Sequence, residues 1–358
     1  MSLTNYLTLG RSGLRVSPLC LGTMTFGTES GWGAVEDVSR ALFNRYIDAG
    51  GNFIDTANAY TNGTSETMLG KFIEERGLRD QVVLATKFTI NTSRTADRKN
   101  PNAGGNGRKN IYQALEASLR RLKTDYIDLY WLHMWDSITP IEEVISTLND
   151  LVRAGRIRHY GLSDVPAWYA ARAQTLAEQE GKERIVALQL EYSLIERNIE
   201  REHVPMAAEL GMGLCPWSPL ASGFLSGKYN RSGGSDPTGR LELSKQNSMF
   251  DRFTERNWNI LDTLLEIANA LGKTPSQVAL NWAVHQPAVA SVIIGATKMA
   301  QLDDNLTALD FDIPQELKTR LDEASAPELI YPYTFFHSPR FVKSFTGGIP
   351  QRRWTPGL

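Results

Sequence analysis

Short hydrophobic segments recur along the chain and predict eight β-strands. They span 18–22, 52–56, 82–87, 126–133, 157–162, 185–190, 213–216 and 290–295. Those at 82–85 and 291–294 are nearly continuous apolar runs, as in strands covered on both faces. Between the strands, apolar residues return every three to four positions over 35–49, 111–122, 141–151 and 258–271, which predicts helices.

The spacing of these elements favours a closed barrel. Strand starts at 52, 82, 126, 156, 185 and 211 fall mostly 26 to 30 residues apart, the length of one strand–helix unit. Eight such units predict an α/β fold of the (β/α)8 TIM-barrel type. The main rival is an open doubly wound sheet, but the Gly-x-Gly-x-x-Gly turn that it wants after an early strand does not occur.

Four further stretches complete this picture. The polar, glycine-containing segments 89–110 and 229–247 predict long exposed loops on the catalytic face of the barrel. Segments 6–9 and 14–17 flank Gly10 and Gly13 and predict an N-terminal hairpin that closes the opposite end. The aromatic, proline-rich tail 326–358 has no clear period, and Phe335 and Phe336 could border the mouth or pack outside the barrel. We expect one domain over 1–358.

Composition narrows the class of protein. The chain is 42% hydrophobic and 22% charged, as in a globular rather than a disordered protein. Its 38 basic and 40 acidic residues give a net charge of −2, which argues against nucleic acid as a partner. No apolar run approaches the ~18–20 residues of a membrane helix. The N-terminus lacks a signal-peptide pattern, and Cys20 and Cys215 lie in apolar runs, so we expect free thiols in the cytoplasm.

Polar residues stand where the predicted strands end. The set is Asp55, Lys87, His133, Ser163, Gln189, Trp217 and Gly295, with Tyr60 in the loop after Asp55. A solvated strand end is the plainer explanation for any one of them. That explanation weakens because Asp, Lys and His end three consecutive strands, and the carboxyl ends of barrel strands meet at one mouth.

Eight segments together point to a known family. They are 52–57 with Tyr60, 85–87, 125–130 with 132–133, 161–163, Gln189 with 192–193, 217–220, 227–229, and 294–295 with Gln301 and Asn305. In this order they resemble the aldo-keto reductase superfamily, including bacterial-type members related to channel β subunits and to aryl-alcohol dehydrogenases. The resemblance implies a barrel that binds NADP(H) across its mouth and reduces small carbonyl compounds.

The resemblance places Asp55, Tyr60, Lys87 and His133 in a catalytic tetrad. Tyr60 would protonate the carbonyl oxygen, although a phenol has a reference pKa near 10. The Lys87 ammonium would favour the phenolate and lower that pKa, Asp55 would hold Lys87, and His133 would orient the substrate. The alternatives are an ordinary buried ion pair for Asp55 and Lys87 and a satisfied core histidine for His133.

The same resemblance implies a long cofactor site. Its expected residues are Thr23, Met24, Asp55, Ser163, Asp164, Gln189, Trp217, Ser218, Pro219, Leu220, Ser222, Lys228, Arg240, Gly295, Thr297, Lys298, Gln301, Asp304 and Asn305. Ser163 and Gln189 would bind the carboxamide, and Trp217 would stack on the nicotinamide unless it is only a core aromatic. The segment 218–222 would follow the pyrophosphate, with Lys228 and Arg240 adding positive charge.

The start of the helix after the last strand would bind the rest of the cofactor. Thr297 and Gln301 would line the 2′-phosphate pocket, and Asp304 and Asn305 would contact adenine. Lys298 is a candidate phosphate partner or part of a solvated face.

Two residues depart from the family pattern. Asp164 stands where many relatives have Asn, and a carboxylate can only accept hydrogen bonds. The carboxamide contact is therefore altered, or Asp164 is protonated in the complex, or it faces elsewhere. Thr297 lies in a segment where many relatives carry Arg, which weakens the preference for NADPH and leaves NADH as an alternative.

The substrate contacts are less specific, and other functions stay open. Phe26, Trp32, Phe88 and Trp135 could form an apolar wall at the mouth or pack in the core. A regulatory NADP(H)-binding subunit resembling channel β subunits is the alternative to an enzyme, although those relatives lack a histidine at the position of His133. A Schiff-base aldolase with Lys87 as nucleophile is a third reading. No histidine pair has metal-ligand spacing, so we expect no metal. The pattern does not fix substrate or oligomeric state.

Overall fold

The computed structural model describes residues 1–29, 31–92, 100–229, 231, 241 and 252–349. The chain divides into two compact units, Met1–Ser325 and Ala326–Leu358. The first unit contains the predicted barrel and the second is the tail. Among the helices described, none is both long and apolar enough to span a bilayer.

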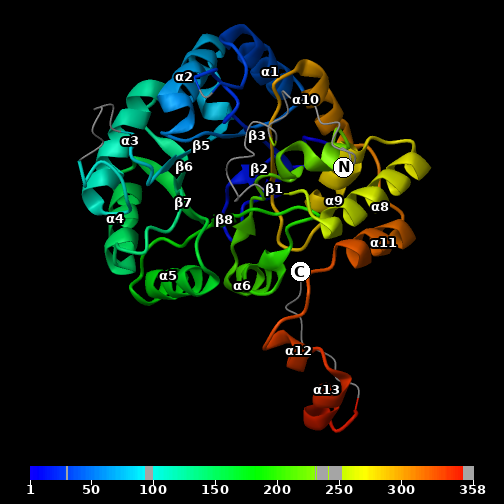
Figure 1. Cartoon of the computed structure of the whole chain (residues 1–358). Helices are drawn as coiled ribbons and strands as arrows, with labels where there is room; N and C mark the ends of the chain where they lie inside the picture. The colour runs from blue at the N-terminus through cyan, green and yellow to red at the C-terminus, as the bar shows by residue number, and fades with distance from the viewer. Residues whose placement is uncertain (30, 93–99, 230, 232–240, 242–251, 350–358) are drawn as a thin grey trace. The chain divides into compact units, whose positions relative to one another are not determined.

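Eight parallel strands form one sheet in the order β10-β3-β4-β5-β6-β7-β8-β9. They are β3 (Leu19–Gly22), β4 (Phe53–Asp55), β5 (Val83–Phe88), β6 (Ile127–Leu132), β7 (Ile157–Ser163), β8 (Ala187–Gln189), β9 (Gly213–Leu214) and β10 (Val292–Ile294). All eight predicted strands are confirmed, with ends shifted by up to two residues. Figure 1 shows the strands surrounded by a ring of helices.

Hydrogen bonds between the β9 and β10 segments close the sheet, because these are the last and the first strands in this order. The amide of Ala290 donates to the carbonyl of Leu214 at 2.9 Å, and the amide of Ile293 donates to the carbonyl of Pro216 at 2.9 Å. Because β10 also pairs with β3, the sheet returns to its first strand. The predicted (β/α)8 barrel is confirmed.

Helices lie on the outside of the barrel in chain order. They are α1 (Glu36–Asp48), α2 (Thr64–Arg76), α3 (Arg108–Leu122), α4 (Ile141–Arg153), α5 (Ala167–Gln179), α6 (His203–Leu210), α8 (Glu255–Leu271), α9 (Pro275–Val284), α10 (Met299–Leu306) and α11 (Gln315–Ser325). Short 3₁₀ turns are η1 (Tyr60–Gly63), η2 (Arg79–Gln81), η3 (Asn198–Glu200), η4 (Ala221–Ser226) and η6 (Thr307–Leu309). Local sequence sets several ends: Thr274 and Gln277 form a capping box before α9, and Gly272 ends α8 with φ 61°.

Side-chain alternation along the strands creates two cores. Residues that face the helices, such as Leu84 and Tyr130, belong to a large outer core. Alternate residues, such as Phe53, Val83 and Trp131, belong to a smaller core inside the barrel. Because the period is two, the same inner face next presents Asp55, Lys87 and His133 at the carboxyl ends of β4, β5 and β6.

The N-terminal hairpin belongs to the inner core. Strands β1 (Leu7–Thr8) and β2 (Arg15–Val16) pair antiparallel, as predicted. Leu9 and Val16 are fully buried and pack with the inner residues of the barrel strands. Since those contacts are at the amino ends of the strands, the hairpin closes the end opposite the polar residues.

The first predicted loop is only partly as expected. In segment 89–110, Thr89 and Asn106 are buried rather than exposed, and α3 already begins at Arg108. The reason is that their side chains bond to each other, from Thr89 Oγ1 to Asn106 Oδ1 at 2.6 Å. Most of 229–247 lies outside the described residues.

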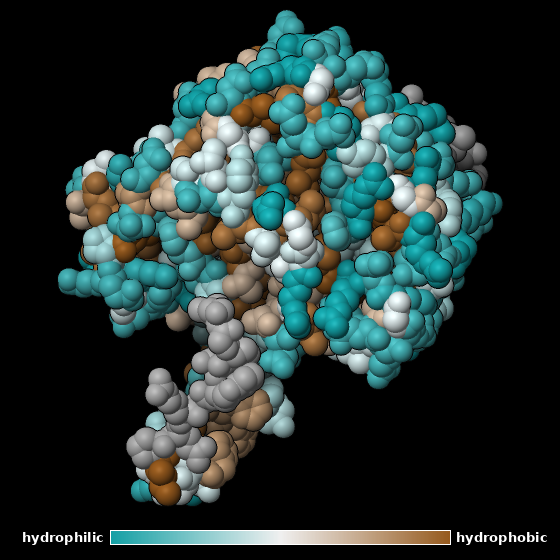
Figure 2. Space-filling model, turned by 180° about the vertical axis from the view of Figure 1, so that it is seen from behind, coloured by the Kyte–Doolittle hydropathy of each residue, from teal (hydrophilic) through white to brown (hydrophobic). Residues whose placement is uncertain are grey.

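The tail, considered alone, contains α12 (Tyr333–Phe336) and α13 (Pro339–Thr346), which the sequence pattern did not predict. Its exposed large hydrophobic residues include Leu329, Ile330, Tyr331, Phe335, Phe336, Phe341, Val342, Phe345 and Ile349. In Figure 2 this unit carries tan and brown atoms, whereas teal covers most of the barrel face in that view. That the tail borders the mouth stays a prediction.

Candidate active site

An ion pair and a phenol lie together at the carboxyl ends of β4 and β5. Lys87 Nζ donates to Asp55 Oδ2, to the carbonyl of Thr56 at 2.8 Å and to Tyr60 Oη at 3.2 Å. Lys87 has no accessible surface and Asp55 is 2% exposed. Tyr60 begins η1, whose next two residues have left-handed φ values of 47° and 55°. This tight turn directs the phenol back to the strand that carries Lys87.

The charges of this group support one another. Burial disfavours the ammonium, but Asp55 and Tyr60 outweigh it, so the pKa of Lys87 is raised. Burial raises the pKa of the Tyr60 phenol, and the positive charge of Lys87 opposes that rise without cancelling it, so the pKa is raised rather than lowered as we expected. The three acceptors around Nζ use all three of its protons. Lys87 is therefore an ammonium, which does not fit the Schiff-base reading, since that mechanism needs a free amine.

His133 follows β6 and faces the same group. Its ring centroid lies 5.8 Å from that of Tyr60, with the planes at 80°. Burial and the nearby Lys87 charge lower the pKa of His133 to about 3, so the imidazole is neutral at physiological pH. Its Nδ1 is buried and has no hydrogen-bond partner among the described residues. Such an atom costs free energy unless a ligand or water satisfies it.

Two residues that we expected in an exposed loop hold the backbone of His133. Its amide donates to Thr89 Oγ1 at 3.2 Å. Asn106, which bonds to Thr89, also donates through Nδ2 to the carbonyl of Met134 at 3.0 Å. Sequence reasoning missed this support, because a polar segment gives no signal that two of its side chains fold inward.

The next strand ends bring amide and hydroxyl groups to the mouth. Ser163 and Gln189 end β7 and β8 and pair across the sheet. Gln189 Nε2 donates to Asp55 Oδ1 at 3.0 Å, so its side chain joins the Asp55–Lys87 pair. The family resemblance implied a cofactor contact for Gln189 but did not reveal this contact with Asp55.

Asp164 and Trp217 contact each other at the rim. Trp217 Nε1 donates to Asp164 Oδ1 at 3.0 Å. The Asp164 carboxylate therefore faces the indole of Trp217. Its side chain reaches solvent, yet the protein packed around it removes part of the solvation of the carboxylate and raises the pKa of Asp164 to about 6. The Trp217 hydrogen bond and the Lys87 charge oppose this rise. Trp217 itself is half-buried, so its ring is not simply a core aromatic.

The segment after β9 forms a tight backbone turn. Ser218, Ala221 and Ser222 have left-handed φ values of 54°, 49° and 57°. The amide of Ser222 donates to Ser218 Oγ at 3.2 Å. A Cβ at Gly223 would lie 3.0 Å from Lys228 Nζ, so the lysine passes close to this turn. Pro219 is buried and Leu220 half-buried, and Arg240 lies outside the described residues.

The residues at the start of α10 are only partly free for a ligand. Gln301 Oε1 accepts from the amide of Thr297 at 2.9 Å and from its hydroxyl at 3.2 Å. Asp304 accepts from Thr274 Oγ1 at 3.0 Å and from Gln277 Nε2 at 2.8 Å. Both carboxyl oxygens of Asp304 thus bind the start of α9. Asp304 therefore links α10 to α9, in addition to the adenine contact that we expected.

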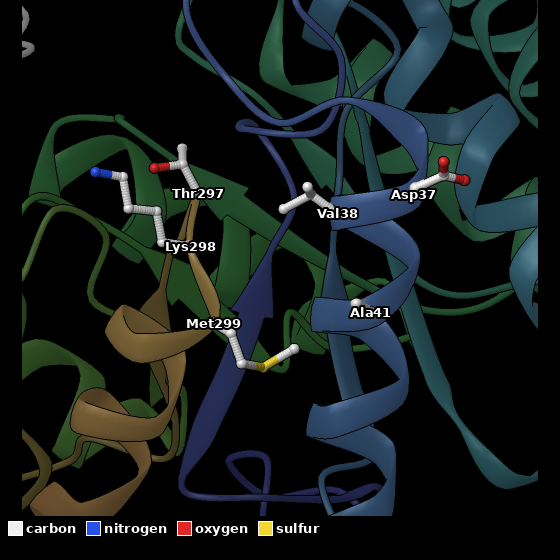
Figure 3. Close-up of a pocket in the computed structure, with 6 residues that line it drawn as sticks. All are labelled: Asp37, Val38, Ala41, Thr297, Lys298 and Met299. Carbon is white, nitrogen blue, oxygen red and sulfur yellow. The ribbon is translucent and has the colours of Figure 1, made fainter.

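A hollow of about 400 Å³ lies between α1 and the start of α10. Thr297, Lys298 and Met299 line one side, and Asp37, Val38 and Ala41 line the other. Figure 3 shows Lys298 and Thr297 on the α10 side, with Asp37 pointing away from them. Gly295 is exposed beside this segment, and the buried Asn305 donates to its carbonyl at 3.4 Å.

These groups have the composition that a dinucleotide needs. Amide and hydroxyl groups lie near Lys87, an indole ring lies beside them, and Lys228 and Lys298 follow at the backbone turn and at a helix start. At the same mouth, the buried Nδ1 of His133 has no hydrogen-bond partner in the described part of the protein. The residues present therefore fit a nicotinamide cofactor with a substrate beside it.

The side chain of Thr23 makes its contacts within the protein. Its hydroxyl is fully buried, donates to the carbonyl of Asp55 at 3.0 Å and lies 2.9 Å from Ser65 Oγ. A side chain so occupied supports Asp55. Met24, the next residue, is half-buried.

The expected aromatic wall divides into two pairs. Phe26 and Phe88 have no accessible surface and belong to the outer core, so the core-packing alternative holds for both. Phe88 follows Lys87 on β5, and strand alternation turns it toward the helices. Trp32 and Trp135 are half-buried, and Trp135 packs edge-on against Trp168 at 5.6 Å. Across the part of the chain that the structure describes, no cluster of side chains could hold a metal ion.

A comparison with known families agrees with this arrangement. The profile described as "Aldo/keto reductase family" matches residues 18–326, which covers the barrel from its first strand to the end of α11. The chain belongs to the aldo/keto reductase family. Members of this family act on small carbonyl compounds with a nicotinamide cofactor, and this aldo/keto reductase is an oxidoreductase.

Named relatives cover most of the chain. "Norsolorinic acid reductase stcV" of Emericella nidulans is 35% identical over 334 residues, which are 92% of this chain and 84% of that protein. "Aryl-alcohol dehydrogenase [NADP(+)]" of Phanerodontia chrysosporium is 34% identical over 90% of this chain and 86% of its own length. "Uncharacterized oxidoreductase YrpG" of Bacillus subtilis is 35% identical, over 89% of this chain and 95% of its own.

Proposed function

We propose that this aldo/keto reductase reduces an aldehyde or ketone to an alcohol with NADPH, and that Tyr60 is the general acid. The observation that carries the proposal is the contact of the Tyr60 phenol with a buried ammonium, Lys87 Nζ, at 3.2 Å. The nicotinamide supplies the hydride when it is bound. Two of the named relatives are a reductase and an NADP(+) dehydrogenase, which supports the same chemistry and cofactor here.

Each residue of the group has a defined task in this proposal. Tyr60 gives its proton to the carbonyl oxygen as negative charge develops there. Lys87 stabilises the resulting phenolate, and Asp55 keeps Lys87 protonated and in place. His133, neutral because the pKa of its imidazole is lowered to about 3, donates a hydrogen bond to the same oxygen and orients the substrate.

The remaining strand ends hold the cofactor in this proposal. Ser163 and the side-chain oxygen of Gln189 bind the carboxamide, and Trp217 stacks on the nicotinamide ring. Ser218, Ser222 and Lys228 follow the phosphates. Thr297 and Lys298, at the hollow in Figure 3, are the groups best placed for the 2′-phosphate, which favours NADPH over NADH. We also propose the cytoplasm as its compartment, because Cys20 and Cys215 are both free thiols.

The test compares Tyr60→Phe with a matched substitution. A panel of aromatic aldehydes and ketones is assayed with NADPH and with NADH, following the absorbance of the reduced nicotinamide. Tyr60→Phe removes the proton donor, so kcat should fall about 10²- to 10⁴-fold while the Kd for NADPH stays the same. Tyr112→Phe alters an exposed tyrosine on α3 and should leave kcat unchanged. Full activity in Tyr60→Phe would reject Tyr60 as the acid.

A further inference from the structure

Asp164 is held firmly at the rim of the mouth. Its φ of 45° is a left-handed backbone conformation that residues other than glycine seldom adopt. Its amide donates to the carbonyl of Gln189 at 3.2 Å, and its carbonyl accepts from the amide of Trp135 at 3.3 Å. The Trp217 indole fixes its side chain at 3.0 Å. Contacts to two neighbouring strand ends and to the Trp135 loop therefore define where this carboxylate lies.

Among the described residues, the charge of Asp164 has no ion-pair partner of opposite sign. Three carboxylates surround this side of the mouth. Asp55 forms an ion pair with Lys87, and Glu191 forms one with Arg252. Asp164 forms none with any Lys or Arg of the described segments, and its field acts on both Tyr60 and Glu191. The described part of the mouth therefore carries one carboxylate without an ion pair, and that carboxylate is hydrogen-bonded to the Trp217 ring.

Such a charge distinguishes the two forms of a nicotinamide. The oxidised ring carries one positive charge and the reduced ring carries none, while the rest of the cofactor is the same in both. We propose that Asp164 makes this enzyme bind NADP⁺ in preference to NADPH, and that it thereby favours carbonyl reduction within the bound complex, since reduction converts the neutral ring into the cationic one. In that direction Tyr60 would give its proton to the carbonyl oxygen while the carbonyl carbon receives the hydride that a bound nicotinamide supplies. The inference rests on the proposed function, because it requires the ring to lie on Trp217.

The preference should depend on pH. The carboxylate must be ionised to attract the oxidised ring, and its raised pKa places that change near pH 6. The groups that face it are Lys87 from β5, Tyr60 from η1, and Glu191 after β8 with its partner Arg252. The 2′-phosphate of the cofactor also titrates near pH 6, but it is common to both forms and cancels in the ratio of their Kd values.

The variant Asp164→Asn isolates the charge. Asparagine has the same size and still offers an oxygen to Trp217 Nε1, so the ring keeps its hydrogen bond. Kd values for NADP⁺ and NADPH are measured on the full chain by quenching of tryptophan fluorescence at pH 8. The ratio Kd(NADPH)/Kd(NADP⁺) should fall about tenfold in Asp164→Asn, as expected for loss of one charge near the ring that solvent screens only in part. The double variant Glu191→Gln with Arg252→Gln removes a neighbouring carboxylate together with its cation, leaves the net charge of the mouth unchanged and should change the ratio less than twofold.

Two results would overturn the inference. One is a ratio in Asp164→Asn within twofold of the wild type, with both nucleotides bound. The other uses the wild type alone, so it does not depend on folding of a variant: the ratio should rise as pH increases from 5 to 8, and a constant ratio would contradict the inference. If the wild type binds neither nucleotide, the proposed function itself fails, which is a different outcome.

Discussion

Lys87 combines three contacts that give it one role. Its ammonium lies between a carboxylate, a backbone carbonyl and a phenol, and each of its protons has an acceptor. Because the side chain is fully buried, no solvent screens its charge. The positive charge therefore acts on the phenol, and a free amine nucleophile does not form.

The lowered pKa of His133 makes the stability of the protein depend on pH. Its pKa is about 3 in the native protein, whereas an unfolded histidine titrates near 6.5. Between these values the unfolded chain binds a proton that the native protein does not. The free energy of unfolding should therefore fall as pH decreases from about 6.5, by at most about 1.4 kcal/mol per pH unit and less because the side chain is partly exposed.

The measurement compares urea unfolding of the wild type and His133→Gln. Between pH 7 and pH 5 the variant should lose at least about 0.5 kcal/mol less stability than the wild type, because glutamine takes up no proton. Between pH 7 and 8.5, above the window, the two should change in parallel. Equal slopes below pH 6.5 would show that His133 ionises normally.

Individual site residues differed in how far sequence could predict them. The positions of Asp55, Lys87 and His133 at one end of the barrel could be predicted because each ends an apolar strand, and topology brings strand ends together. The pattern left Phe88 open between the mouth and the core, although the alternation of strand side chains next to Lys87 could have placed it in the outer core. Thr89 and Asn106 could not be found, since only the folded loop shows that their polar groups bind each other.

Helix α2 is joined to β3 and β4 through a buried hydroxyl. Ser65 Oγ lies 2.9 Å from Thr23 Oγ1 and 2.9 Å from Thr56 Oγ1, and it donates to the carbonyl of Thr23 at 2.8 Å. Thr23 in turn bonds to the carbonyl of Asp55. This cluster ties the first turn of α2 to the strand that ends in the candidate active site.

Ser65→Ala should therefore destabilise the protein by about 1–3 kcal/mol in urea unfolding, since it leaves buried hydroxyls with fewer partners. Ser118 is the matched control: it is also fully buried, on α3, but its hydroxyl has no hydrogen-bond partner within the described segments. Ser118→Ala should be neutral or slightly stabilising. An equal effect of both changes would mean that the cluster contributes no specific stability.

The N-terminal hairpin packs closely against the amino ends of the barrel strands. A Cβ at Gly10 would lie 2.3 Å from the carbonyl oxygen of Val186 and 2.7 Å from that of Gly211, and φ at Gly10 is +58°. Gly13, in the same hairpin, has open space around it. The two glycines look alike in the sequence, and only one of them is sterically required.

Gly10→Ala should lower the free energy of unfolding by at least about 2 kcal/mol, from the left-handed backbone and the forced displacement of neighbouring backbone. Gly13→Ala should leave it unchanged or raise it by up to about 1 kcal/mol. Because the hairpin lies opposite the mouth, kcat per folded molecule should be the same in both. Similar stabilities of the two variants in urea would refute the close fit.

The whole architecture was easier to predict than its details. Regular spacing of apolar strands is a property of the entire chain, so eight units and the barrel could be inferred before any residue was placed. The helices α12 and α13 could not, because the aromatic tail shows no regular period over that stretch. The way in which Gln189 and Asp164 use their hydrogen bonds depends on distances that a sequence does not contain.

Cys20 and Cys215 face the interior of the barrel, with no accessible surface. Burial raises the pKa of both thiols, so neither forms the thiolate that reacts with alkylating reagents. A reagent can reach them only when neighbouring strands separate. The rate at which iodoacetamide labels these two sulfurs should therefore report the rate at which the barrel opens. A bound cofactor that holds the strands together would slow this labelling.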